Sequence, residues 1–226
     1  MEKDQSEQPL FRGLGDEGKR AVLSEARPNR YAKGSAVFEQ DEEAHSFFLL
    51  TEGHLRVTRL TPDGQQVVVR YISPGEPFGV AMAIGRATYP GTATAVVDSV
   101  ALAWPTAVWP RLVSAHPLLA ANAMQLLGGR LMDANTRLVE MSTQQVERRI
   151  AHTLLRLAQQ SGKRIEKGIQ IDFPISRQDV AEMTGATLHT VSRVMSAWEE
   201  KGLVESGRQR IVLTDPHRLM MLAEGE

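Results

Sequence analysis

Residues 188–193 carry side chains that could form hydrogen bonds with the edges of nucleic-acid bases. An arginine can pair with guanine through two hydrogen bonds, and histidine and serine can each donate or accept one. The residues that recur at helical spacing and should face inward are Val191, Val194, Met195 and Trp198. The outer face of this predicted helix would then hold the candidates for base readout, which are Leu188, His189, Ser192 and Arg193.

A helix-turn-helix is the arrangement that would place these side chains in a major groove. Ser176 precedes a helical run and has Asp179 three residues later, which predicts a capping box in its acidic form. Gly185 suits the tight turn, because glycine adopts a positive φ at low cost. Thr187 is a good N-cap for the second helix. An ordinary helical hairpin is the alternative that this stretch alone leaves open.

A basic hairpin follows the second predicted helix, which Gly202 ends. Ser206 and Gly207 should form its turn, with Arg208 and Arg210 beside it. This hairpin would be a wing that reaches phosphate, and a solvated edge strand protected by its charge is the alternative. The residues expected to hold DNA phosphates are Arg177, Gln178, Thr187, Thr190, Arg208 and Arg210.

The composition is that of an ordinary globular protein, with 42% hydrophobic residues, 23% charged residues and a net charge of -1. The 226 residues include no cysteine. This excludes disulfides, thiolate zinc sites, Cys-ligated haem and Cys-ligated iron–sulfur clusters. No apolar run has transmembrane length, and the polar start does not resemble a signal peptide. We therefore expect a cytoplasmic protein with no membrane partner.

The first half of the chain reads as short strands with closely spaced turns, which is typical of a sandwich or barrel. The candidate strands are residues 47–53, 54–60, 66–72 and 92–104. Residues 1–9 should be a disordered tail, and short helices are expected at 16–26 and 106–112. This pattern predicts a β-roll sensor domain over residues 1–116.

A long helix is predicted from Pro117 to about Ser142. Its apolar residues follow one another in steps of four and three, a heptad seam that favours a parallel coiled-coil homodimer. The seam residues are Met124, Leu127, Leu131, Ala134, Leu138 and Met141. A helix packed on its own domain is the alternative. The predicted domains are a sensor (1–116), a dimerisation helix (117–142) and a DNA-binding domain (143–226).

Residues 147–159 and 175–204, with the wing after them, resemble the CRP/FNR family of bacterial transcription regulators. The resemblance implies an α+β fold with three parts. These are a double-stranded β-roll like the cyclic-nucleotide-binding jelly roll, a long dimerisation helix and a winged helix-turn-helix. It also implies a homodimer that binds double-stranded DNA and contacts RNA polymerase. Such a dimer binds a palindrome whose half-sites are about 34–36 Å apart.

The family's readout positions fall on the four candidates above, and His189 stands where most relatives have glutamate. In this respect the chain resembles the NnrR-type branch, which controls nitric-oxide and denitrification genes at TTG…CAA palindromes. The resemblance therefore implies a regulator that responds to nitric oxide. A constitutive regulator, or one that responds to another small ligand, is the alternative.

Binding of cyclic AMP is not expected, because the positions that hold it in the family are changed. Val80 stands at the position of a glutamate, and Thr88 and Tyr89 stand at the Arg-Ser pair. The hydroxyl positions of the long helix hold Ala134 and Asn135. A cyclic phosphate would be buried there without a cationic partner, which costs several kcal/mol.

The predicted effector pocket is apolar instead, and it suits haem, another flat apolar ligand or no ligand. Its predicted lining is Phe78, Gly79, Val80, Tyr89, Leu127, Leu131 and Ala134, with Met82 and Ile84 beside them. The candidate haem ligands are His45, His54 and His116, and each also reads as a surface histidine.

A cupin-like metalloenzyme is a remote alternative, since cupins share the β-roll shape. His45 and Glu52 lie in one segment, but no His-x-His pair or second ligand cluster accompanies them. Nucleophile elbows and phosphate-binding P-loops are absent from the sequence. We therefore expect no enzymatic activity and no metal site apart from haem.

Overall fold

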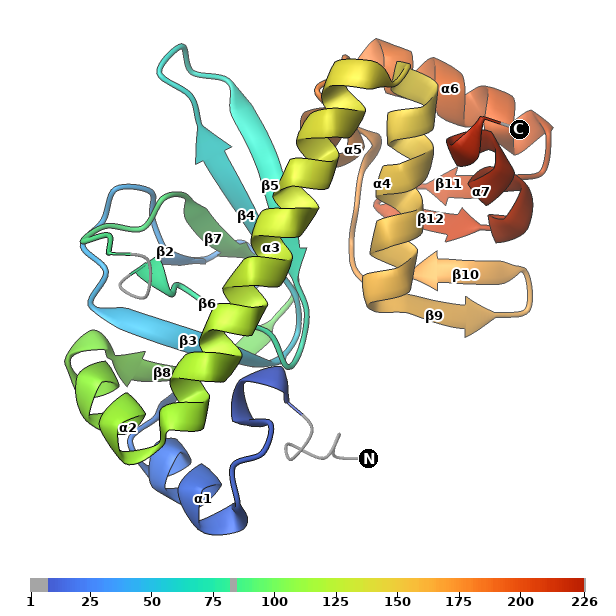
Figure 1. The fold of residues 1–226 in the computed structure, drawn as a ribbon. Helices are drawn as coiled ribbons and strands as arrows, with labels where there is room; N and C mark the ends of the chain where they lie inside the picture. The colour runs from blue at the N-terminus through green and yellow to red at the C-terminus, as the bar shows by residue number, and fades with distance from the viewer. Residues whose placement is uncertain (1–7, 82–84, 226) are drawn as a thin grey trace. The chain divides into compact units, whose positions relative to one another are not determined.

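The computed structural model describes residues 8–81 and 85–225 (Figure 1). The chain divides into two compact units. They comprise, respectively, Met1–Leu60 with Tyr71–Ala134, and Thr61–Arg70 with Asn135–Glu226. The division therefore falls inside the long helix, whereas domain boundaries were predicted at its two ends.

Two four-stranded sheets form the β-roll. The first sheet has the order β1 (Arg27–Tyr31), β8 (Ser99–Pro105), β3 (Ser46–Glu52) and β6 (Pro77–Phe78). The second has the order β2 (Ala36–Phe38), β7 (Thr92–Ala95), β4 (Leu55–Leu60) and β5 (Gln66–Ile72). Strands β1, β2 and β6 were not predicted from sequence. They are short, and β1 reads RPNRY, which has no apolar alternation.

Strand β3 separates two hydrophobic cores, because successive side chains of a strand point to opposite faces. Phe48 and Leu50 face the inside of the roll, where residues of both sheets form one buried cluster. Phe47 and Leu49 face the outside and join a second cluster that includes Trp104. The strand is therefore buried on both faces.

Helices cover the outer face of the roll. They are η2 (Pro9–Phe11), α1 (Asp16–Ser24), η4 (Thr106–Val108), α2 (Trp109–Ala115) and the first part of α3 (Pro117–Thr143). Trp104 Nε1 donates to the Val22 carbonyl oxygen of α1 at 2.8 Å, and Phe11 packs edge-on against Trp104. Both predicted short helices are present, the second as η4 followed by α2. Residues 1–7 lie outside the described chain, but the predicted tail is wrong at its end, because Pro9 begins η2 and Phe11 is buried.

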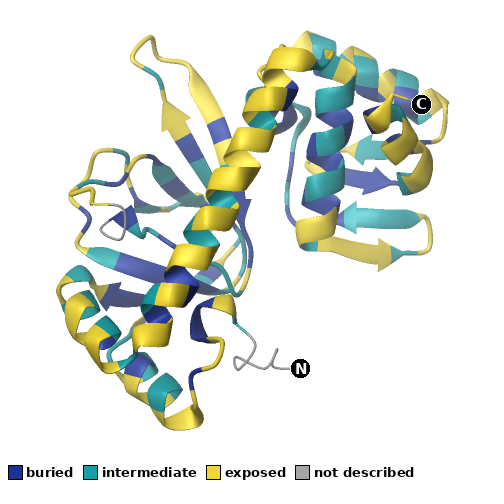
Figure 2. Cartoon of the chain, viewed as in Figure 1, coloured by how far each residue is buried: buried dark blue, intermediate teal, exposed yellow. Residues whose placement is uncertain are grey.

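Most of helix α3 is exposed (Figure 2), and several of its exposed residues are large and apolar. Their exposed fractions are Met124 73%, Leu131 71%, Leu138 62% and Met141 53%. All four belong to the predicted heptad seam, and such a row on an exposed helix marks a protein–protein contact. Although α3 is long, no helix in the described ranges is long and apolar enough to cross a membrane.

The second unit contains a winged helix-turn-helix with a four-stranded sheet of order β11-β12-β10-β9. Its elements are α4 (Val146–Ser161), β9 (Gly162–Ile165), β10 (Gly168–Ile171), α5 (Arg177–Thr184), α6 (Leu188–Glu200), β11 (Val204–Gly207), β12 (Arg210–Leu213) and α7 (Pro216–Glu224). Trp198 of α6 is completely buried, and its Nε1 donates to Glu147 of α4 at 3.0 Å. Strand β9 and helix α7 were not predicted. The predicted fold class, a β-roll, a long helix and a winged helix-turn-helix, is confirmed.

Candidate functional site

Two capped helix starts and a left-handed glycine hold the turn between α5 and α6. The Asp179 N–H donates to Ser176 Oγ at 3.1 Å, and the Ser176 N–H donates to Asp179 Oδ2 at 2.8 Å. Gly185 has a φ of 62°, a value at which other residues are strained. Thr187 Oγ1 accepts from the Thr190 N–H at 3.2 Å. The caps and the turn predicted from the sequence are therefore present.

One face of α6 is buried and the opposite face is open. Val191, Met195 and Trp198 are completely buried on the inner side. Of the four predicted readout residues, Leu188, His189 and Arg193 are exposed on the open side and Ser192 is partly buried. Arg193 has no hydrogen-bond or ion-pair partner within the described residues, so its guanidinium is available to a base.

The wing is the hairpin of β11 and β12, and its turn lies further along the chain than predicted. Gly207 pairs with Arg210 in the ladder, which corrects the prediction that Ser206 and Gly207 form the turn. The turn residues are Arg208 and Gln209, and Gln209 supplies a positive φ of 58°. Arg208 is exposed at the tip, whereas Arg210 Nε donates to a glutamine of β10 at 2.9 Å.

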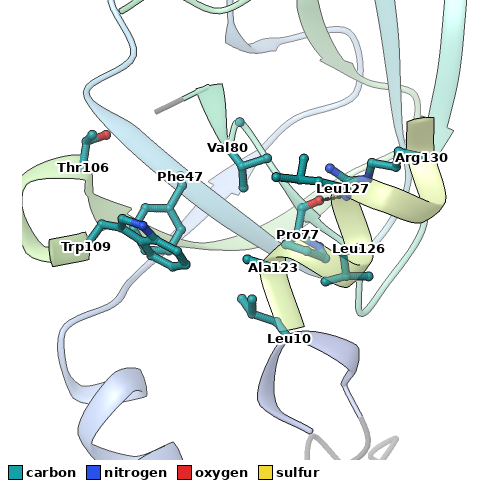
Figure 3. A pocket seen from close by; sticks show the side chains of 11 residues that line it. Leu10, Phe47, Pro77, Val80, Thr106, Trp109, Ala123, Leu126, Leu127 and Arg130 are labelled. Atoms are coloured by element: carbon teal, nitrogen blue, oxygen red, sulfur yellow. Dashed lines mark hydrogen bonds between the residues drawn. The ribbon is translucent and has the colours of Figure 1, made fainter. Parts of the chain in front are cut away.

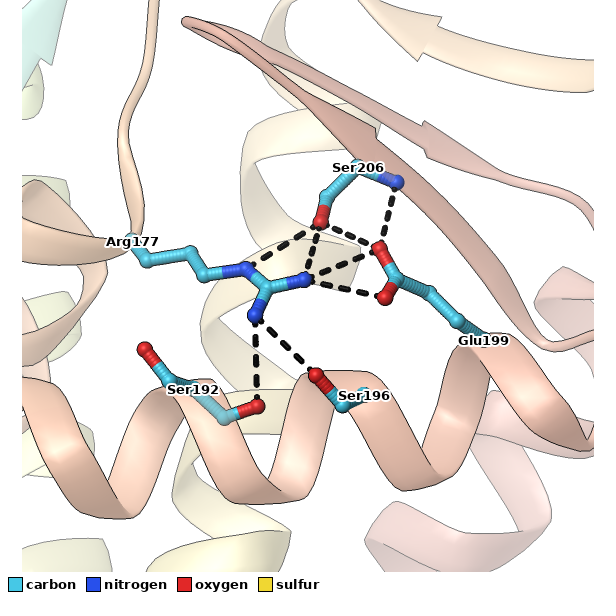
Figure 4. Close-up of polar contacts among 5 residues, drawn as sticks. All are labelled: Arg177, Ser192, Ser196, Glu199 and Ser206. Carbon is cyan, nitrogen blue, oxygen red and sulfur yellow. Dashed lines mark hydrogen bonds and ion pairs between the residues drawn. The ribbon is translucent and has the colours of Figure 1, made fainter.

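Arg177, a predicted phosphate ligand, directs its guanidinium towards α6 and β11 (Figure 4). It forms an ion pair with Glu199 at 3.0 Å. It donates to Ser206 Oγ from Nη2 at 2.7 Å and from Nε at 3.2 Å. From Nη1 it donates to the Ser192 carbonyl oxygen at 3.3 Å and to Ser196 Oγ at 3.2 Å. One side chain of α5 thus joins the recognition helix to the wing, and we call these five residues the Arg177 network.

Glu199 completes the Arg177 network as its main acceptor. Its Oε1 accepts from the Ser206 N–H at 3.0 Å and also from the Ser206 hydroxyl. Burial acts to raise the pKa of Glu199. The hydrogen bonds from Ser206 and Arg177, with the charge of Arg177, outweigh burial and hold the pKa below that of an ordinary glutamate. The carboxylate is therefore ionised at neutral pH.

The Arg177 network was not predicted, because its members come from three separate elements. Ser192, Ser196 and Glu199 follow one another in steps of four and three, which places them in one row on α6. This row is the signal in the sequence that could have indicated a shared partner. Of the other predicted phosphate ligands, Gln178 donates to Glu182 on its own helix at 2.9 Å.

An aromatic cluster occupies the inside of the β-roll, where the resemblance would place a cyclic nucleotide. Phe38 and Tyr89 stack with 3.8 Å between ring centroids, and Phe48 and Phe78 stack at 5.0 Å. The Tyr89 hydroxyl donates to the Ser46 carbonyl oxygen at 2.6 Å and accepts from the Ser46 N–H at 3.2 Å. Burial of this hydroxyl raises the pKa of Tyr89. The residue at the predicted Arg-Ser position is thus part of a packed core.

An apolar pocket lies on the other face of β3, between the roll and the outer helices (Figure 3). Phe47 contributes from β3, Trp109 from α2 and Leu127 from α3. Arg130 of α3 also borders the pocket, and its Nη2 donates to the Pro77 carbonyl oxygen. The lining residues are Leu10, Phe47, Pro77, Gly79, Val80, Thr106, Trp109, Ala123, Leu126, Leu127 and Arg130.

The residues predicted for the effector pocket are divided between three environments. These are the interior cluster (Phe78, Tyr89), the outer pocket (Gly79, Val80, Leu127) and the exposed surface of α3 (Leu131, Ala134). Gly79 lies between the outer pocket and the interior cluster, because a Cβ added there would be 2.8 Å from the ring of Phe48 in that cluster. Met82 and Ile84 lie outside the described residues. The apolar pocket therefore has a lining different from the predicted one.

None of the three candidate haem ligands lines this pocket. His45 is exposed and lies 3.5 Å from the Glu43 carboxylate, His54 is partly buried, and the His116 ring lies beside Gly18 of α1. Across residues 8–81 and 85–225, no group of acidic or histidine side chains could hold a metal ion. No described lining residue of the pocket is a common iron ligand either, so these residues do not fit haem.

Two different protein-family models match the two parts of the chain. A cyclic nucleotide-binding domain model matches residues 28–116, and a Crp-like helix-turn-helix domain model matches residues 148–222. The cyclic AMP receptor protein of Thermus thermophilus is 30% identical over 217 residues, which are 96% of this chain and 97% of that protein. The nitrogen fixation regulation protein FixK of Bradyrhizobium diazoefficiens is 28% identical over 193 residues, covering 85% of this chain and 80% of that one.

Solved structures support the same fold. FixK2 from Bradyrhizobium japonicum matches with a TM-score of 0.76 and 24% identity, covering 87% of this chain and 96% of that chain. The matched relatives are transcription regulators and not enzymes, which sets aside the cupin-like alternative. With these matches and with a recognition helix and wing of the expected form, the chain belongs to the CRP/FNR family of DNA-binding transcription regulators.

Proposed function

We propose that this chain is a homodimeric regulator that binds a palindromic operator through α6 and the wing. The open face of α6, on which Leu188, His189 and Arg193 are exposed and Ser192 is partly buried, is the observation that carries the proposal. Arg193 supplies a two-bond contact to guanine, and Arg208 at the wing tip supplies a phosphate contact. Contact with RNA polymerase is part of the proposal and rests on the family likeness alone.

The exposed seam of α3 supports a two-fold dimer. A second copy of the same helix would cover Leu131 and Leu138 in a parallel coiled coil. The two α6 helices would then enter successive major grooves about 34–36 Å apart. The operator is accordingly a palindrome of the TTG…CAA kind, the half-site implied by the likeness of the readout residues to the NnrR-type branch.

Cyclic AMP is not the effector in this proposal. The relative from Thermus thermophilus is named as a cyclic AMP receptor, but the roll of this chain is filled by stacked rings. Tyr89 lies 3.8 Å from Phe38, ring centroid to ring centroid, at the position where a phosphate would need a cation. Moving one of these rings out of the core would cost about 1.5–3 kcal/mol, because its apolar surface would be exposed to water.

The apolar pocket outside the roll is the better candidate for an effector site. Phe47, Trp109 and Leu127 supply apolar surface, and Arg130 adds one cationic group at the border. A small apolar molecule with a hydrogen-bond acceptor suits this combination. Because Leu127 belongs to the dimer helix, a bound molecule would act on α3 directly.

Response to nitric oxide through haem is the second candidate, and it rests on the likeness to the NnrR-type branch. Haem would need an iron ligand from outside the lining of the apolar pocket. An anaerobic haem titration, read by visible absorption before and after nitric oxide, distinguishes the two candidates. A saturable Soret band that nitric oxide shifts supports haem. The lack of a specific band favours another apolar effector or constitutive DNA binding.

Selection of binding sites from random duplex DNA tests the proposed operator. The purified chain should enrich a palindrome with half-sites about one helical turn apart. The Arg193→Ala variant should enrich the same spacing with a relaxed guanine position. Failure of the wild-type chain to enrich any palindrome, with or without a candidate effector, would contradict the proposed function.

A further inference from the structure

We propose that Arg177 and Glu199 are positioning residues for DNA recognition. They fix the wing against the recognition helix, so that Arg208 meets the phosphate backbone while Arg193 meets a base. Neither Arg177 nor Glu199 touches DNA in this role. The inference rests on the proposed binding of a palindromic operator.

The contacts of Ser206 show how the wing is held. Ser206 lies two residues before Arg208 at the wing tip. Its N–H donates to Glu199 Oε1 at 3.0 Å, and its hydroxyl oxygen accepts from Arg177 Nη2 at 2.7 Å. Backbone and side chain of the wing strand are therefore both bonded to the Arg177 network, close to the turn that carries the exposed arginine.

The contacts on α6 show what the wing is held against. Arg177 Nη1 donates to the Ser192 carbonyl oxygen at 3.3 Å and to Ser196 Oγ at 3.2 Å. Ser192 is itself a predicted readout residue, and it directly precedes Arg193. A planar guanidinium with a fork of donors suits this task, because it bonds several acceptors in one fixed geometry.

The same observations speak against a phosphate contact as the main role of Arg177. All three guanidinium nitrogens donate to acceptors of the protein, and the Glu199 carboxylate beside them offsets the positive charge. An arginine that served only to attract phosphate would act better without that carboxylate. The two roles therefore predict opposite effects of removing the charge of Glu199.

Glu199→Gln is the variant that separates the two roles, and Glu200→Gln is its control. Both remove one negative charge from the end of α6, but Glu200 is exposed and outside the network. Binding would be measured to the selected palindrome and to a duplex with both half-sites scrambled, at several salt concentrations. We expect Glu199→Gln to weaken palindrome binding roughly tenfold, as for members of one hydrogen-bond network. The dependence of its affinity on salt concentration should also become less steep, by an amount that corresponds to about one phosphate contact per protomer.

Glu200→Gln should bind the palindrome as tightly as the wild type or more tightly. If Glu199→Gln behaves in the same way, the positioning role is overturned. Arg177→Lys provides a second comparison, since it keeps the charge and removes the fork of donors. If Arg177 is a positioning residue, Arg177→Lys should bind the palindrome more weakly than the wild type. If Arg177 contacts phosphate directly, the salt dependence of binding should be unchanged, because lysine keeps the charge.

Ser206→Ala removes only a hydroxyl group, so this variant can test the positioning role if Glu199→Gln proves unstable. Weaker palindrome binding with an unchanged unfolding temperature supports the inference, and unchanged binding by Ser206→Ala and Arg177→Lys overturns it. Failure of the wild-type chain to bind any palindrome would overturn the proposed function as well. The two failures are therefore distinguishable.

Discussion

Glu140 of α3 forms an ion pair with Arg156 of α4, with 2.6 Å between Oε1 and Nη1. The Glu140 side chain is only 9% exposed, and that of Arg156 is 31% exposed. This pair links the two helices on either side of the short break between them. At the break, Arg149 Nη1 also donates to the Gln144 carbonyl oxygen at 2.9 Å. These interactions join the end of α3 to α4 within the second unit.

Removing the acid of the Glu140–Arg156 pair should destabilise the second unit. In Glu140→Gln, Arg156 stays largely covered and is left without its anion, so we expect the free energy of unfolding to fall by about 1–3 kcal/mol. Urea denaturation measures the change. Asp133→Asn removes the same charge from an exposed position of α3 and should have little effect. Equal stability of the two variants would contradict a structural role for the pair.

Stability should also depend on pH through Glu199. Its pKa is lowered in the folded protein, so its contribution is complete above the pKa of an unfolded glutamate. That contribution is lost as the pH falls through the folded pKa. The free energy of unfolding of the wild type minus that of Glu199→Gln should be constant near neutrality and shrink in acid. Denaturation at a series of pH values measures it, and a difference that grows in acid would be the contrary result.

The packed interior of the roll predicts that cyclic AMP does not bind. Calorimetric titration of the wild-type chain should give no saturable heat. In Tyr89→Phe the Ser46 carbonyl oxygen loses its donor, which should cost about 0.5–1.5 kcal/mol of unfolding free energy without creating a nucleotide site. Saturable binding of cyclic AMP at micromolar concentration would show that the aromatic cluster opens.

The heptad seam predicts which exposed residue of α3 supports the dimer. Leu131 and Met132 are 71% and 64% exposed in the single chain, but only Leu131 lies in the seam. Leu131→Lys should yield monomers, because it places a charge in the apolar interface between two helices. Met132→Lys should remain dimeric. Sedimentation velocity would distinguish them, and the same assembly state for both variants would refute this dimer interface.

Features encoded by neighbouring residues could be predicted from the sequence. The capping box of Ser176 and Asp179 and the left-handed Gly185 depend on local preferences, and both are present. The long helix from Pro117 was likewise visible from its heptad spacing. Such features need no knowledge of what the rest of the chain does.

Features set by partners distant in the sequence could not be predicted. Ser206 and Gly207 are a good local turn pair, but pairing with β12 continues through Gly207 and moves the turn to the next two residues. Phe78 and Tyr89 were assigned to an open pocket, and their burial depends on rings from other strands. The row of serines and Glu199 on α6 indicates a shared partner, but it does not identify Arg177 of α5 as that partner or include Ser206 of the wing.

Titration of the selected palindrome by fluorescence anisotropy tests the central claim most directly. We predict salt-dependent binding of two chains per palindrome, much weaker binding to the scrambled duplex, and about a tenfold to hundredfold weaker affinity in Arg193→Ala. Arg208→Ala should weaken binding to both duplexes and lower the salt slope by about 1 for each phosphate that the wing no longer neutralises. Equal affinity for the palindrome and the scrambled duplex, unchanged by Arg193→Ala, would contradict the account.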